Sequence, residues 1–69
     1  MSANEARDKY IKDGQREFSR ARADDTHLFA VLTTKLEREY DQAVREETTP
    51  MSPHALVAVF LKFYPQWKN

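Results

Sequence analysis

A nearly continuous apolar run close to the carboxyl end is the feature that most constrains this chain. From Ala55 to Tyr64 the only charged residue is Lys62. The run is too short to cross a bilayer as a helix, which takes roughly 20 residues. Its side chains must therefore be buried against protein rather than lipid. A chain of 69 residues has little material for this, because a domain near that size buries only about 60% of the surface its unfolded form exposes. Few neighbouring elements, or another molecule, must therefore cover the run.

Composition favours a compact helical domain. The chain is 41% hydrophobic and 12% aromatic, which is too apolar for a disordered protein. A single glycine excludes a glycine-rich phosphate loop. The absence of cysteine excludes a disulfide scaffold, a thiolate metal site and a cysteine nucleophile. The 11 basic and 11 acidic side chains balance, so net charge does not indicate a nucleic-acid or membrane-surface protein. We expect a soluble, cytoplasmic protein without a membrane segment.

The first helix is predicted over about residues 2–22. Ser2 and Glu5 have the spacing of a capping box. The apolar stripe of this helix is thin, and Glu17 projects close to its centre. Gly14 costs the helix about 1 kcal/mol relative to alanine, unless the close approach of a neighbouring backbone compensates. The stripe consists of Ala3, Ala6, Tyr10, Gly14, Phe18 and Ala21, with Ile11 at its edge.

The second helix is predicted over about residues 25–46 and has the clearest amphipathic pattern. Asp24 or Asp25 can cap its amino end. No glycine or proline lies between the two helices, so a bent or continuous helix remains an alternative. Charged side chains occupy the face opposite the apolar arc. That arc spans about 160° and contains Leu28, Phe29, Leu32, Leu36, Tyr40, Ala43 and Val44.

The third helix is predicted over about residues 53–64, after a linker over 47–52 and before a tail over 65–69. Ser52 suits an N-cap, and Pro53 suits the first helical position. The β-branched and aromatic content would also suit a strand. The start signal, the length and the absence of a partner strand favour a helix. Its apolar arc spans about 200°, roughly twice what a surface helix needs.

Such a wide arc needs neighbours on more than one side. The plain explanation is a third helix lying between the other two. Because the first helix offers little bulk, we favour an interface instead, and a second copy is the simplest partner. Trp67 can also fold back on its own core. The predicted protein-interface residues are Val59, Phe60, Phe63, Tyr64 and Trp67.

A basic row on the first helix is the second candidate site. Four cationic side chains lie within about 80° of arc, away from the apolar stripe. Such a row could contact a phosphate backbone or an acidic partner. Glu5 and Asp13 interrupt it, however, and we favour an ordinary solvated face. The basic row consists of Lys9, Lys12, Arg16 and Arg20.

Catalytic chemistry finds no support in the sequence. His27 lies near Asp24 and Asp25, yet no second helical ligand pair indicates a metal. His54 lies apart, at the start of another predicted helix, and no serine or threonine has a base and an orienting acid at a recognisable spacing. We therefore expect no enzyme, no metal, no cofactor and no small-molecule substrate.

These observations predict one all-α domain of three helices. The first two run up and down, and a short, mostly buried third helix packs across or between them. The expected function is that of a small non-catalytic protein-binding, regulatory or accessory protein that self-associates through a helical surface. A nucleic-acid-associated accessory protein that uses the basic row is the first alternative. A structural small subunit of a larger complex is the second.

Overall fold

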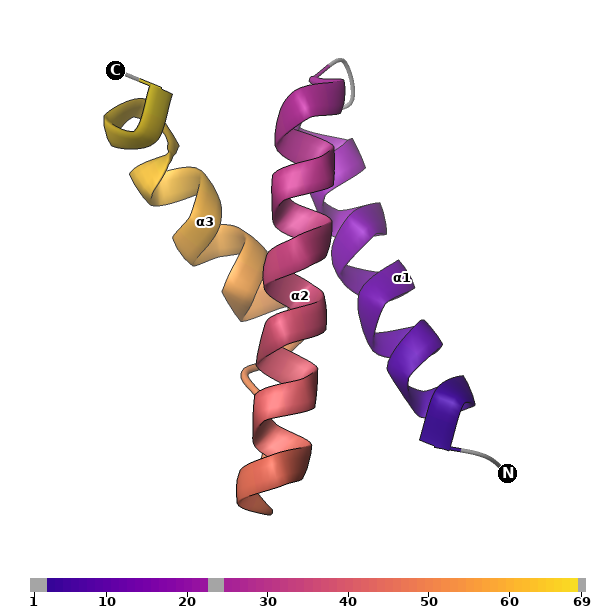
Figure 1. Cartoon of the computed structure of the whole chain (residues 1–69). Helices are drawn as coiled ribbons and strands as arrows, with labels where there is room; N and C mark the ends of the chain where they lie inside the picture. The colour runs from indigo at the N-terminus through magenta and orange to yellow at the C-terminus, as the bar shows by residue number, and fades with distance from the viewer. Residues whose placement is uncertain (1–2, 23–24, 69) are drawn as a thin grey trace.

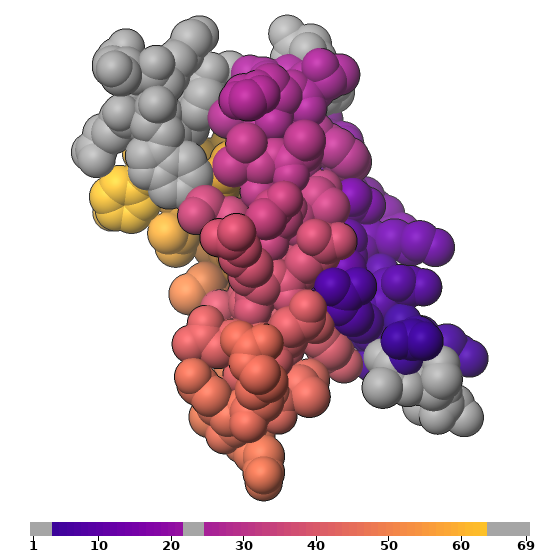
Figure 2. Space-filling model, viewed as in Figure 1, coloured from indigo at the N-terminus to yellow at the C-terminus, as the bar shows by residue number. Residues whose placement is uncertain are grey.

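The chain folds into three α-helices that run up, down and up (Figure 1). The computed structural model describes the backbone of residues 3–22 and 25–68 and the side chains of residues 4–21 and 25–63. Within these residues the helices are α1 (Ala3–Arg22), α2 (Thr26–Glu46) and α3 (Pro53–Lys68). The all-α fold predicted from periodicity is confirmed, and the space-filling view shows α2 across the front with α1 and α3 at its two edges (Figure 2).

Two side-chain caps set where the second and third helices begin. Asp25 has an extended backbone, and its Oδ1 accepts a hydrogen bond from the Leu28 N–H at 3.0 Å. This cap separates α2 from α1, which excludes the continuous helix. Ser52 Oγ accepts from the Ala55 N–H at 3.1 Å, as its position before Pro53 predicts. Each oxygen satisfies an amide that the first turn of a helix leaves without a partner.

A buried cluster joins the three helices, and Phe18 lies at its centre. The Phe18 side chain is fully buried, and its ring centroid lies 6.1 Å from that of Phe29 and 6.2 Å from that of Phe60. One residue of α1 thereby contacts both other helices. The buried cluster consists of Tyr10, Phe18, Leu28, Leu32, Leu36, Val57 and Phe60.

Polar contacts hold α1 to α2 at the edge of this cluster. Arg7 donates to both carboxylate oxygens of Asp41, with Nε–Oδ1 at 2.9 Å and Nη2–Oδ2 at 3.1 Å. This hydrogen-bonded guanidinium holds the pKa of Asp41 below its usual value. Gln15 Nε2 donates to Thr33 Oγ1 at 2.9 Å. These contacts fix how the two helices are aligned along their length.

The third helix is longer and less buried than its sequence suggests. It continues through Pro65 to Lys68, whereas the prediction ended at residue 64. A proline inside a helix removes one backbone hydrogen bond, and its ring clashes with the carbonyl four residues earlier, which kinks the helix or ends it. Here the helix continues beyond Pro65, and its ribbon changes direction near this end (Figure 1). Among the described side chains of α3 only Val57 and Phe60 are buried. The helix packs more extensively against α1 than against α2.

Smaller differences follow from how tightly each helix end is packed. Val44 belongs to the predicted apolar arc, yet it is 60% exposed because it lies in the last turn of α2. Ala6 and Ala21 are exposed as well, near the two ends of α1. The predicted cap at Ser2 lies outside the described residues.

Gly14 provides the closest approach between α1 and α2, and it generates a prediction. A Cβ atom at this position would lie 2.5 Å from Leu36 Cδ2 and 3.1 Å from Leu36 Cγ. The Leu36 side chain is fully buried and has little room to move. Overpacking costs about 1–3 kcal/mol, while the better helix propensity of alanine returns about 1 kcal/mol. We expect Gly14→Ala to lower the free energy of unfolding, measured by urea denaturation.

Two comparisons make this result specific to the helix contact. Ser19→Ala changes an exposed residue of the same helix and should stabilise the protein slightly through propensity alone. Shortening the opposing side chain with Leu36→Val should reduce the cost of Gly14→Ala, as a double-mutant cycle would show. If Gly14→Ala stabilises the protein as much as Ser19→Ala does, the close approach of α1 and α2 does not constrain this position.

Candidate functional site

Two hydrogen bonds fix one residue of the linker before α3. The Tyr10 hydroxyl of α1 donates to the Met51 carbonyl oxygen at 2.6 Å. The Met51 N–H donates to Glu39 Oε2 of α2 at 2.8 Å. Both backbone groups of Met51 are therefore held, one by each of the first two helices. Its side chain nevertheless remains 44% exposed.

The held linker forms one wall of a groove between α2 and α3. On α3, Leu56, Val59 and Phe60 recur at helical spacing and share one side of the helix. Phe60 is 2% exposed, whereas Val59 is 46% exposed. The groove stays open because α3 leans away from α2 toward its carboxyl end (Figure 1). We call it the α2–α3 groove, and it is lined by Lys35, Glu39, Met51, Leu56, Val59 and Phe60.

Exposed apolar side chains gather around this groove. Among the described side chains, four large hydrophobic ones are exposed: Val44, Met51, Val59 and Phe63. Met51 and Val59 line the groove, and Phe63 follows Val59 by one helical turn. We call these three residues the exposed apolar face. Exposed hydrophobic side chains that cluster in this way typically mark a binding surface, whereas single ones do not.

The Tyr10 hydroxyl that supports the groove is held in its neutral form. Burial of the side chain, together with the negative charge of Glu39, raises the pKa of Tyr10 to about 12. The ring packs beside that of Tyr40, with centroids 5.4 Å apart. At neutral pH the hydroxyl therefore keeps the proton that it donates to Met51.

The structure divides the predicted interface residues into three groups. Val59 and Phe63 lie on the exposed apolar face, where a partner can reach them. Phe60 is 2% exposed and packs against Phe18 in the core, although it also lines the α2–α3 groove. The side chains of Tyr64 and Trp67 lie outside the described residues.

Sequence reasoning missed the part of the groove that α3 does not supply. The sequence pattern placed Lys35 on the solvated face of the second helix and did not single out Glu39. It placed Met51 in the linker over 47–52. One signal was present, because Met51 is an apolar residue between Pro50 and Pro53 in an otherwise polar segment. Its hydrogen bonds to α1 and α2 join residues 41 and 12 positions apart, which no local pattern reveals.

On the other side of α3, a polar bridge joins this helix to α1. His54 Nδ1 lies 2.6 Å from Glu17 Oε2, although the histidine side chain is 80% exposed. Glu17, which the sequence places near the centre of the apolar stripe, thus ends at the rim of the core. A shallow depression beside it is lined mainly by apolar or small residues of α1 and α3, namely Ala21, Val57, Ala58 and Leu61, with Glu17, Arg20 and His54 at its edge.

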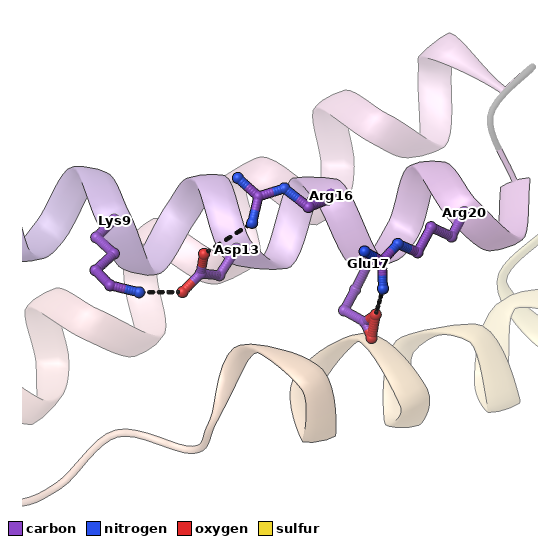
Figure 3. A network of polar contacts seen from close by, with 5 residues as sticks. All are labelled: Lys9, Asp13, Arg16, Glu17 and Arg20. Carbon is purple, nitrogen blue, oxygen red and sulfur yellow. Dashed lines mark hydrogen bonds and ion pairs between the residues drawn. The ribbon is translucent and has the colours of Figure 1, made fainter.

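The basic row of α1 is largely paired with carboxylates of its own helix (Figure 3). Lys9 Nζ lies 2.9 Å from Asp13 Oδ2, and Arg16 Nη1 lies 3.5 Å from Asp13 Oδ1. Arg20 Nη1 lies 3.6 Å from Glu17 Oε1. Lys12 lies on the same surface, together with Glu5 and Asp8. The row therefore presents less positive charge to a phosphate than its spacing suggests.

The described residues contain neither a cluster of metal ligands nor a helix able to span a membrane. Their histidine and carboxylate side chains form no group of three or more that could hold a metal ion. Asp25, considered beside His27 as a ligand, caps α2 instead, and Asp24 lies outside the described residues. None of the helices, over the part described, combines the length and the apolar character that crossing a membrane requires.

No family model, curated protein or solved structure matches this chain. Its function is therefore inferred from the physical character of its surfaces. Of these, the α2–α3 groove with the exposed apolar face combines a depression, exposed hydrophobic side chains and a backbone fixed from two sides.

The Tyr10–Glu39 pair makes the support of the groove sensitive to alkaline pH. The folded protein keeps the Tyr10 proton up to about pH 12, whereas the unfolded chain loses it near the ordinary value of 10.0. This contribution to stability is complete below pH 10 and is lost as the pH rises toward 12. Glu39→Gln removes the negative charge but keeps an oxygen that can accept from Met51. We expect this variant to have a lower Tyr10 pKa, measured from tyrosinate absorbance.

Assignment of the titration requires one control, because the chain has three tyrosines. Tyr10→Phe should remove the tyrosinate transition near pH 12. A Tyr10 pKa that does not change in Glu39→Gln would show that the carboxylate has no electrostatic effect on the hydroxyl.

Proposed function

We propose that this chain is a small non-catalytic protein-binding domain, and that its binding surface is the α2–α3 groove with the exposed apolar face. One observation carries the proposal: Met51, Val59 and Phe63 stay exposed beside a groove whose linker wall is held by hydrogen bonds. Its size suits an accessory subunit or a regulator that acts by occupying a partner's surface.

Burial of the exposed apolar face would supply part of the free energy of association. Full burial of an aliphatic or aromatic side chain contributes roughly 1.5–3 kcal/mol. Each residue of the exposed apolar face is already about half buried, so only part of that amount remains to be gained. The two hydrogen bonds to the Met51 backbone reduce the entropy lost on binding, since they order this backbone before a partner arrives.

The arrangement of polar groups also fits a protein partner. Lys35 and Glu39 of α2 border the apolar centre of the groove, and protein interfaces commonly combine an apolar centre with a polar rim. An apolar helix face seated in such a groove is a common mode of recognition, with contacts at every third or fourth residue. The basic row also borders a depression, but the residues that line it are all charged, and the cations of the row are largely paired.

Site-specific photocrosslinking in the protein's own host tests this proposal. Benzoylphenylalanine in place of Phe63 keeps an aromatic ring on the exposed apolar face and reacts with whatever covers it. We expect a covalent adduct with a protein chain, detected by a shift in mass and identified by peptide sequencing. The adduct should resist nuclease.

The same photoreactive residue in place of Lys12 is the matched control. Lys12 is exposed on the outer face of α1, within the basic row. Comparable protein adducts from both positions would indicate random collision rather than a binding surface. An adduct with nucleic acid at Lys12, with none at Phe63, would transfer the function to the basic row.

A further inference from the structure

We infer that the molecule covering the α2–α3 groove is a second copy of this chain, related to the first by a two-fold axis. This inference rests on the proposed binding function and names its partner. Three properties of the groove support it: its shape, its rim charges and the net charge of the chain.

The groove and the side chains that would fill it lie on the same helix. A two-fold interface joins identical patches, so the patch must be complementary to itself. On α3, Leu56 and Phe60 line the depression, while Val59 and Phe63 remain exposed within one or two turns. Rotation about an axis near Val59 brings the exposed side chains of each copy toward the depression of the other. Both depressions are then filled by the same set of contacts.

The charges at the rim are self-complementary as well. Lys35 and Glu39 are one helical turn apart on α2, and both border the groove. When two copies of α2 lie antiparallel across the axis, Lys35 of one copy faces Glu39 of the second copy, and the reverse pair forms at the same time. A partner of uniform charge would match only one of the two rim residues.

The chain as a whole does not oppose the approach of another copy. Its 11 basic and 11 acidic side chains give a formal net charge of +0. Copies of a strongly charged chain repel one another within the Debye screening length. This chain has no net charge and therefore lacks that repulsion. Association can therefore be governed by the apolar contacts.

Sedimentation equilibrium of the full chain over a range of concentrations tests the inference. We expect a mass that rises toward twice 8.1 kDa as concentration increases. Val59→Glu places a charge at the proposed axis in both copies and should raise the dissociation constant by about a hundredfold. Val44→Glu is the matched control, because it makes the same change at a 60% exposed valine outside the groove, and it should leave the dissociation constant unchanged.

A charge-exchange experiment tests the two-fold pairing itself. Lys35→Glu and Glu39→Lys each place like charges opposite one another, so each variant alone should dimerise weakly. An equimolar mixture restores opposite charges at both rim positions and should form a heterodimer. Circular dichroism establishes that each variant is folded, which matters for Glu39→Lys because it also loses the acceptor for the Met51 N–H.

The possible outcomes separate this inference from the proposed function. A monomeric mass at millimolar concentration, or a dimer that Val59→Glu and Val44→Glu affect equally, would overturn the inference. If the Phe63 crosslink then joins a different protein, the binding function stands with another partner. If Phe63 yields no protein adduct and the chain is monomeric, both fail.

Discussion

The contact of Gly14 with Leu36 is the constraint on which the rest of the structure depends. Because glycine has no side chain, α1 comes close enough to α2 for the Leu36 methyl groups to occupy the space of a Cβ. One turn later the large ring of Phe18 fills the space among all three helices and packs against Phe29 and Phe60. A small residue followed by a large one thus sets both the spacing of the first two helices and the position of the third.

That arrangement explains why a groove forms between α2 and α3 rather than elsewhere. Phe18 belongs to α1, so the packing of Phe60 and Val57 draws α3 mainly toward α1. The side of α3 that faces α2 is left partly uncovered, with Val59 exposed and Leu56 half-buried. Tyr10 and Glu39 then fix Met51 at the start of the uncovered side. The same packing that buries one half of α3 therefore exposes the other.

Local patterns predicted the elements of this fold better than its surfaces. The cap at Ser52 was predicted from residue spacing, and Asp25 was one of the two candidates for the cap of α2. The 200° arc of α3, however, does not indicate which half α1 will cover, so the packing of Phe60 against Phe18 could not be read from it. The end of α2 at Glu46 agrees with the predicted range, but the left-handed backbone of Glu47, φ 57°, was not foreseen because that conformation usually belongs to glycine. The hydrogen bonds that hold Met51 join residues far apart in the chain, so no local pattern could predict them.

A chain of this size gains most from covering its own exposed apolar face. Domains of about this length have small cores and correspondingly small margins of stability, and here Val59 and Phe63 contribute less than full burial would, because solvent reaches them. If association buries them, the free energy of binding also becomes free energy of folding, since the unfolded chain cannot pair in the same way. The groove then has two physical roles: it selects a partner and stabilises the three helices that form it. We expect a surface with both roles to keep its apolar side chains exposed in the single chain, because a partner must reach them. That exposure lowers the stability of the isolated domain.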